Sequence, residues 1–227
     1  MIEKPGRALI LIACACAIFW PGAFIFGFPG VMSQHWQQAF NVGGSAVGKT
    51  VFFVLIGATC FMYLCGRWQE KFGPGKLAAL GAILCGSSVI WLGRAENMNA
   101  VYAWAFFTGA SSAFIYVPAL TVVQRWYPAR RGLVSGFFNM AFGLAAGIMS
   151  PVFSALLSSW GYKTINLLLG CVALIVGLAA STLIRSPEVH LPVPAADTVI
   201  EPTSRSVGEA LKTREFWCLW LLSLIHI

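Results

Sequence analysis

Residues 66–76 read GRWQEKFGPGK, and they separate two apolar runs, residues 45–65 and 77–93. Gly73 and Gly75 permit a tight turn after the charged residues. Each flanking run has about the length that a helix needs to cross the hydrocarbon core of a bilayer. The stretch therefore predicts a hairpin of two membrane-spanning helices with a polar turn at one membrane surface.

The same alternation of apolar runs and polar turns fills the whole chain. Of its 227 residues, 58% are hydrophobic and 10% are charged, whereas soluble domains carry roughly 25% charged residues. A soluble fold of this size could not bury so much apolar surface. The predicted fold class is an all-α membrane protein, with a six-helix transmembrane bundle plus the start of a seventh helix. The expected spans are residues 8–32, 45–65, 77–93, 100–123, 133–158 and 164–184.

Three regions are expected along the chain. Residues 1–184 form the six-helix transmembrane bundle. Residues 185–214 contain scattered charges and four prolines, which predicts a flexible linker. Residues 215–227 are expected to be the truncated start of transmembrane helix 7, because a helix of that length reaches only about 20 Å, short of the roughly 30 Å core.

The cationic residues predict the orientation of the bundle. The formal net charge of +7 could indicate a nucleic-acid partner, but the Lys and Arg residues lie almost entirely between the apolar runs, which favours a membrane topology and no nucleic acid. Sorted by alternate turns, they place the N-terminus and residues 185–214 in the cytoplasm, in a multi-pass protein of the bacterial inner membrane. The cytoplasmic group is Lys4, Arg7, Arg67, Lys71, Lys76, Arg125, Arg130, Arg131, Arg185, Arg205, Lys212 and Arg214, and the opposite group is Lys49, Arg94 and Lys163.

No catalytic or metal-binding constellation is found in the sequence. Every Asp and Glu falls in a turn or at a helix edge, and the seven cysteines lie in or beside apolar runs without a CxxC pair. The chain is therefore not expected to be an enzyme or to hold a metal or cofactor. A proton carrier inside the membrane needs an ionisable group, so coupling to protons would require one outside these six helices.

The fifth span carries small and polar residues on one side. At 100° per residue, such a stripe lets a neighbouring backbone approach closely, which predicts helix packing; the alternative is that Asn139 or Ser150 also reaches a central substrate path. Relative to Gly132, the members lie at about 40° for Gly136, 340° for Asn139, 20° for Gly143, 60° for Gly147 and 0° for Ser150.

Two other spans carry aromatic residues. Tyr116 lies in the fourth span, and its hydroxyl needs a partner that is either another helix or a substrate. The first span contains an aromatic series that is expected to pack or face lipid rather than to form a cage. That series is Phe19, Trp20, Phe24, Phe26 and Phe28.

The turn at residues 66–76 resembles the loop signature between helices 2 and 3 of the major facilitator superfamily, with Glu70 where Asp is more usual. In that family the loop helps to latch two six-helix halves and gates alternating access. The resemblance implies this role for Gly66, Glu70, Lys71, Gly73 and Lys76. It also implies that the chain is an N-terminal half and that a C-terminal six-helix half is missing.

A second stretch narrows the resemblance to one branch. Residues 125–136, RWYPARRGLVSG, resemble the junction of helices 4 and 5 in oxalate/formate antiporters and the related monocarboxylate transporters, and residues 211–220 resemble the start of helix 7. In that branch the position of Tyr116 lines the anion cavity, whereas Phe142 stands where the family has a tyrosine, which weakens the case for oxalate. The cytoplasmic motif comprises Arg125, Trp126, Pro128, Arg130, Arg131 and Gly132.

The resulting hypothesis is a secondary active transporter that works by alternating access and moves a small organic anion. Its expected partners are the lipid bilayer, the small-molecule solute and the missing half, which would supply the cationic groups for the anion. Tyr116, Asn139 and Phe142 are the candidate substrate-binding residues. Two alternatives remain open: a facilitator or proton-coupled carrier of another small solute, and a transporter-like membrane sensor without turnover.

Overall fold

The structure is a computed structural model and describes residues 6–187, 212–214 and 216–218. The chain divides into two compact units, Met1–Pro187 and Glu188–Ile227, and each is described by itself. In the second unit the Phe216 backbone N–H donates to Thr213 Oγ1 at 3.4 Å. The predicted linker and seventh helix otherwise lie almost wholly outside the described residues.

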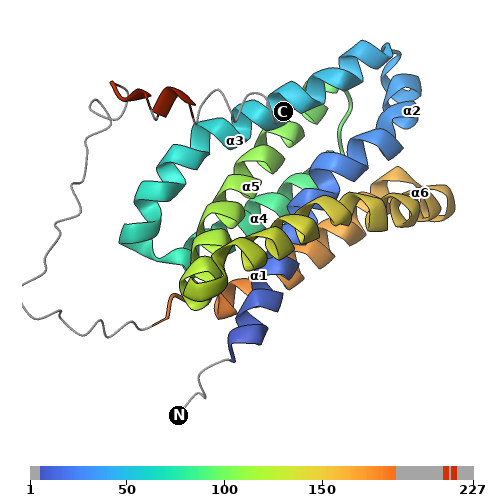
Figure 1. Cartoon of the computed structure of the whole chain (residues 1–227). Coiled ribbons are helices and arrows are strands. Elements are labelled where there is room, and N and C mark those ends of the chain that lie inside the picture. The colour runs from blue at the N-terminus through green and yellow to red at the C-terminus, as the bar shows by residue number, and fades with distance from the viewer. Residues whose placement is uncertain (1–5, 188–211, 215, 219–227) are drawn as a thin grey trace, which may run out of the picture. The chain divides into compact units, whose positions relative to one another are not determined.

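The first unit is a bundle of long helices (Figure 1). The described residues contain no strand, and five of their helical segments are long and apolar enough to cross a membrane. The predicted all-α membrane fold is therefore confirmed. Its elements are α1 (Arg7–Gly22), the π-helical turn η1 (Ala23–Gly27), α2 (Phe28–Phe40), α3 (Gly44–Phe72), α4 (Pro74–Leu92), α5 (Met98–Trp126), the 3-10 turn η2 (Pro128–Arg130) and α6 (Arg131–Leu183).

Helix α6 contains both the fifth and the sixth predicted spans. Its 53 residues would extend for about 80 Å as one straight helix, far more than one crossing requires. Gly161 interrupts it with φ 73° and ψ 168°, a combination that essentially only glycine adopts. Figure 1 shows that α6 has two legs, and that the second leg runs back along the first.

The first span is longer than the sequence predicts. It was expected to end at residue 32, but α2 continues to Phe40 and buries Met32 and Trp36 completely. Pro21 and Pro29 stand on either side of the π-helical turn, and each removes a backbone N–H from the helical ladder. The wider turn accommodates these interruptions without ending the helix.

Close helix crossings in the bundle are made at glycines. A Cβ atom at Gly57 of α3 would overlap the Phe106 carbonyl oxygen, and one at Gly109 of α5 would overlap the Val54 carbonyl oxygen. The backbones of α3 and α5 therefore touch at a reciprocal pair of glycines, as small residues permit between membrane helices. Gly86 and Gly170 form a similar pair between α4 and α6.

The end of the bundle opposite the 66–76 turn is closed by aromatic side chains. Phe24, Phe28 and Phe153 pack with ring centroids 5.1–5.9 Å apart, and they lie in one buried cluster with Trp36 and Trp104. A chain of hydrogen bonds joins three helices here, since Trp36 Nε1 donates to Tyr162 Oη at 3.0 Å and that hydroxyl donates to the Leu92 carbonyl oxygen at 3.1 Å.

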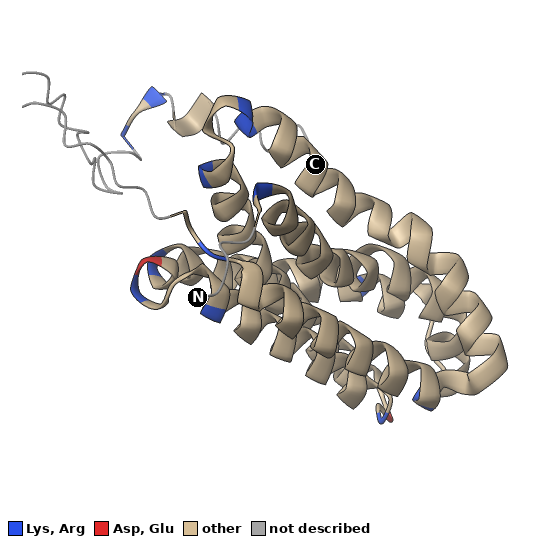
Figure 2. Cartoon of the chain, turned by 90° about the horizontal axis from the view of Figure 1, so that it is seen from below, with Lys and Arg blue, Asp and Glu red and all other residues tan. Residues whose placement is uncertain are grey.

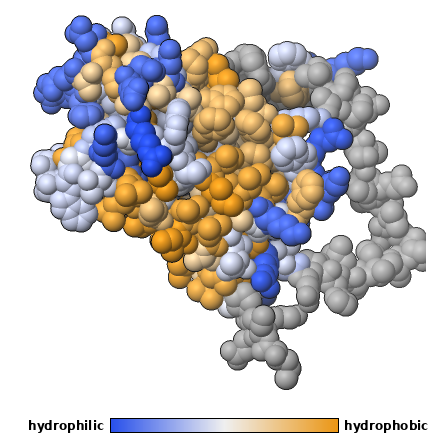
Figure 3. Space-filling view, turned by 180° about the vertical axis from the view of Figure 1, so that it is seen from behind, coloured by the Kyte–Doolittle hydropathy of each residue, from blue (hydrophilic) through white to orange (hydrophobic). Residues whose placement is uncertain are grey.

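Charged residues of the first unit lie at the ends of its helices (Figure 2). Figure 3 shows one face with hydrophobic residues through its middle and hydrophilic residues toward its ends. This distribution suits an apolar bilayer core between two aqueous surfaces. The protein is an integral, multi-pass membrane protein.

Candidate functional site

A groove of about 340 Å³ brings together side chains from four spans of the bundle. The first span contributes at η1, and α3, α5 and the first leg of α6 supply the other walls. The lining residues are Ile25, Phe26, Val54, Leu55, Ala58, Met62, Ser112, Ala113, Tyr116, Asn139 and Phe142.

One hydrogen bond forms the polar centre of this groove. Tyr116 Oη of α5 donates to Asn139 Oδ1 of α6 at 2.8 Å. The Phe142 ring lies beside this pair, 5.9 Å from the Tyr116 ring and 5.2 Å from the Phe26 ring, centroid to centroid. The structure thus places all three predicted substrate-binding residues in one groove.

The local packing explains why these side chains meet. Gly22 of α1 lies against the Phe142 backbone of α6, and any side chain at position 22 would overlap the Phe142 carbonyl oxygen. The two helices therefore approach each other closely beside the groove. The Ser112 hydroxyl donates to the Gly109 carbonyl oxygen of its own helix at 2.7 Å, which satisfies it locally and leaves Tyr116 to bond across helices.

The groove can offer hydrogen bonds but no charge. The two N–H groups of the Asn139 amide have no partner among the described residues, and the Tyr116 hydroxyl oxygen can still accept. The remaining lining is apolar apart from Ser112, and no charged side chain lines the groove. A carboxylate in this position would be hydrogen-bonded but not neutralised by residues of the groove.

Several lining residues were missed by sequence reasoning. Leu55, Ala58 and Met62 of α3 are ordinary apolar residues of a membrane span, and nothing in their pattern indicates the groove. Within the aromatic series of the first span, Phe24 and Phe28 are fully buried as expected of packing residues, whereas Phe26 is 57% exposed and lines the groove. Which of these aromatic side chains is buried and which lines the groove depends on how the helices cross, and the sequence pattern does not show this.

The predicted gating turn joins α3 to α4. Gly73 has φ 83° and ψ 157°, a conformation that essentially only glycine adopts, and its N–H donates to the Gln69 carbonyl oxygen at 3.0 Å. The Lys71 ammonium lies 5.4 Å from the Phe72 ring centroid. Gly66, Glu70 and Lys76 are at the same end of these two helices, and Glu70 has no ion-pair partner among the described residues.

The predicted motif between the fourth and fifth spans forms the 3-10 turn η2 and its flanks. Trp126 Nε1 donates to the Arg185 carbonyl oxygen at 2.7 Å, and an Arg125 guanidinium nitrogen donates to Ser186 Oγ at 3.4 Å. The motif therefore ties the end of α5 to the end of α6. Pro128 and Arg130 lie within η2, and Arg131 and Gly132 begin α6.

The glycine stripe of the fifth span makes no close approach within the described part of the chain. No atom lies within 4 Å of a Cβ built at Gly136, Gly143 or Gly147, whereas such contacts do occur at Gly22 and Gly109. The described part of the chain therefore provides no close neighbour for these three glycines, and α6 turns them toward open space. Helix packing by Gly136, Gly143 and Gly147 stays a prediction.

Comparison with known proteins agrees with this architecture. A family model of the Major Facilitator Superfamily matches residues 8–227. Similar proteins include an oxalate:formate antiporter of Oxalobacter formigenes, 28% identical over 68% of this chain and 37% of the relative. Another is a hexuronate transporter of Escherichia coli, 25% identical over 80% of this chain and 43% of the relative. A third is monocarboxylate transporter 2 of Meriones unguiculatus, 27% identical over 66% of this chain and 32% of the relative.

The aligned regions thus span less than half the length of each of these relatives. The family match nevertheless covers nearly the whole chain, and it includes the 66–76 turn, the η2 motif and the groove. The chain therefore belongs to the Major Facilitator Superfamily.

Proposed function

We propose that this chain forms the N-terminal half of a secondary active transporter, and that its groove is this half's share of the solute path. Solute sites in such transporters lie near the middle of the membrane, between two repeated halves. The hydrogen bond between Tyr116 and Asn139, set in an apolar groove that four spans enclose, is the observation that supports the assignment. It is the only polar interaction between side chains of different helices within that lining.

The proposed solute is a small organic anion. Relatives in two branches are named for carboxylates, as oxalate:formate antiporter and monocarboxylate transporter 2. The Asn139 amide donors suit a carboxylate oxygen, and the aromatic rings of Phe26 and Phe142 suit a short carbon chain. Because no cation lines the groove, a second half would have to supply the positive charge that balances the anion.

The proposed transport cycle is alternating access by two bundles. The 66–76 turn acts as a latch between the halves, and the open side of the glycine stripe is the surface on which the second half packs. The end of the bundle that carries the 66–76 turn and η2 faces the cytoplasm of a bacterial inner membrane, in agreement with its excess of Lys and Arg.

The experiment is uptake of labelled formate, oxalate, pyruvate and lactate by proteoliposomes that contain the complete two-half protein. Saturable uptake of at least one of them is expected, with oxalate the weakest because Phe142 has no hydroxyl to donate. Empty liposomes provide the background rate. Indifference to all four solutes would refute the anion assignment.

A substitution at Asn139 tests whether uptake depends on the groove. Replacing Asn139 with Ala removes both amide donors and the acceptor for Tyr116, so KM for the transported anion is expected to rise about tenfold or more. Unchanged kinetics at normal expression would leave Asn139 a packing residue only.

A further inference from the structure

A second hollow, outside the groove, lies between the start of α1 and the turn that precedes α6. It has a volume of about 330 Å³. Two guanidinium groups and two aromatic side chains contribute to it, a combination that recurs where membrane proteins meet lipid headgroups. The lining residues are Arg7, Trp126, Tyr127, Pro128, Ala129 and Arg130.

The positive charge of this hollow has no counter-charge among the described residues. Arg7 and Arg130 are both exposed, and neither guanidinium group forms an ion pair or hydrogen bond with a described residue. The carboxylates within the described ranges are Glu70 and Glu96, and neither lines the hollow. The Trp126 indole N–H already donates to the Arg185 carbonyl oxygen, so the two guanidinium groups are the cationic donors that this hollow offers.

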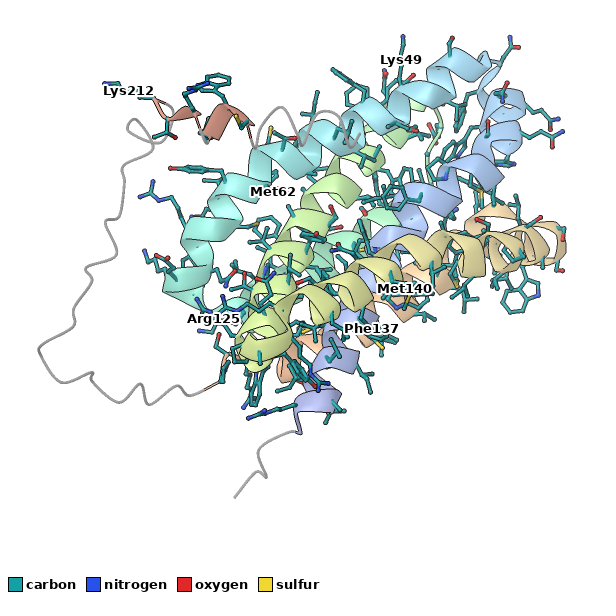
Figure 4. All side chains as sticks on the ribbon, in the orientation of Figure 1. Lys49, Met62, Arg125, Phe137, Met140 and Lys212 are labelled. Atoms are coloured by element: carbon teal, nitrogen blue, oxygen red, sulfur yellow. The ribbon has the colours of Figure 1, made fainter. Side chains whose placement is uncertain are left out.

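An apolar hollow of about 400 Å³ lies along α1 and both legs of α6. Its lining is hydrophobic, and Figure 4 labels Phe137, which stands on the leg of α6 beside α1. The residues are Ile12, Ala15, Cys16, Phe19, Trp20, Phe137, Ala141 and Val176.

The two hollows lie at successive depths in the membrane. At 1.5 Å per residue, Ile12 and Trp20 are about 7 and 20 Å farther along α1 than Arg7, and Phe137 and Ala141 are about 10 and 17 Å beyond Arg130. One leaflet accounts for about half of the roughly 30 Å hydrocarbon core. The apolar hollow therefore lies at the depth of acyl chains, and the cationic hollow lies at the depth of headgroups.

We propose that these two hollows bind one phospholipid with an anionic headgroup. Arg7 and Arg130 hold the phosphate, with Trp126 and Tyr127 beside it at the interface. An acyl chain lies between α1 and α6. A free phosphate ion would account for the arginines but not for the apolar hollow, and a zwitterionic lipid would leave their charge unbalanced. This site does not depend on the proposed transport activity.

Charge recognition is tested by native mass spectrometry of the delipidated protein titrated with dioleoyl phosphatidylglycerol or dioleoyl phosphatidylcholine. The double variant Arg7→Gln/Arg130→Gln should bind phosphatidylglycerol about 30-fold more weakly, and Arg7→Lys/Arg130→Lys should recover most of that loss. The matched control, Arg67→Gln/Arg94→Gln, removes the same charge outside the hollow and should change binding by less than about threefold. An equal loss of phosphatidylglycerol affinity in the two double glutamine variants would overturn the proposal.

Occupancy by the acyl chain is tested with neighbouring residues of α6. Val176 lines the apolar hollow, whereas Ile175 is 66% exposed and does not. Val176→Trp fills the hollow and should lower phosphatidylglycerol affinity at least tenfold relative to Ile175→Trp, with thermal unfolding showing that both variants are folded. Equal affinities, or displacement of the lipid by millimolar inorganic phosphate, would overturn the assignment to a lipid.

Discussion

The crossing of α3 and α5 gives a sharp prediction for Gly109→Ala. A Cβ at this position would overlap the Val54 carbonyl oxygen and would lie 2.8 Å from the Val54 carbonyl carbon and 3.0 Å from its Cα. All three obstacles are backbone atoms, so no side-chain rotation relieves the clash. Because Gly57 meets the Phe106 backbone in the same way, the two helices must separate along the crossing.

Two opposing effects determine how much Gly109→Ala lowers the free energy of unfolding. Overpacking a close-packed interior costs typically 1–3 kcal/mol, and the upper part of this range applies because backbone must move. Alanine in place of glycine inside a helix returns about 1 kcal/mol. The net loss is about 2 kcal/mol, which corresponds to a fall in Tm of about 4–8 °C for a chain of this size.

Thermal unfolding of the detergent-purified chain, followed by circular dichroism, measures this difference. The control is Gly143→Ala, where no atom lies within 4 Å of the added Cβ, so its Tm should equal or slightly exceed that of the parent. If Gly109→Ala unfolds at the same temperature as Gly143→Ala, the reciprocal glycine crossing is refuted.

Three further outcomes are expected. Gly161→Ala should lower Tm through about 1–3 kcal/mol of backbone strain alone, since open space surrounds its Cβ position, and an unchanged Tm would exclude the break in α6. Tyr162→Phe removes the acceptor for the buried Trp36 indole and should cost about 1–3 kcal/mol in thermal unfolding, whereas Tyr63→Phe, at a side chain 61% exposed, should cost almost nothing. The 227-residue chain alone, reconstituted in liposomes, should show no saturable uptake of labelled carboxylates, because its groove contains no cation; measurable uptake would refute the two-half account.

The membrane fold and most spans could be predicted from the sequence because the apolar runs are long and the turns between them are charged. Boundaries were harder to predict. The extension of the first span to Phe40 depends on burial of Trp36, and residues 33–40 are too polar for hydropathy to include them. The turn at Gly161 was expected as a gap between two spans, and its glycine-only backbone explains how they join.

The candidate site was only partly predictable. Tyr116 and Asn139 stood out because polar groups inside a membrane need partners, and each is the other's partner. The side chains of α3 in the groove gave no signal, because an apolar residue toward a groove resembles one toward lipid. The sequence predicts that the glycine stripe packs against a helix, but sequence spacing cannot determine which neighbour, if any, covers it.

The central claim is that the pair formed by Tyr116 and Asn139 contacts the transported solute. The direct measurement is kcat/KM for uptake by the two-half protein carrying Tyr116→Phe, compared with Tyr102→Phe, whose hydroxyl donates to the Ala46 carbonyl oxygen outside the groove. Tyr116→Phe removes the hydrogen bond that orients the Asn139 amide toward the solute. This loss should lower kcat/KM about two- to tenfold, whereas Tyr102→Phe should stay near the parent value. Equal kcat/KM values for Tyr116→Phe and the parent would contradict the assignment.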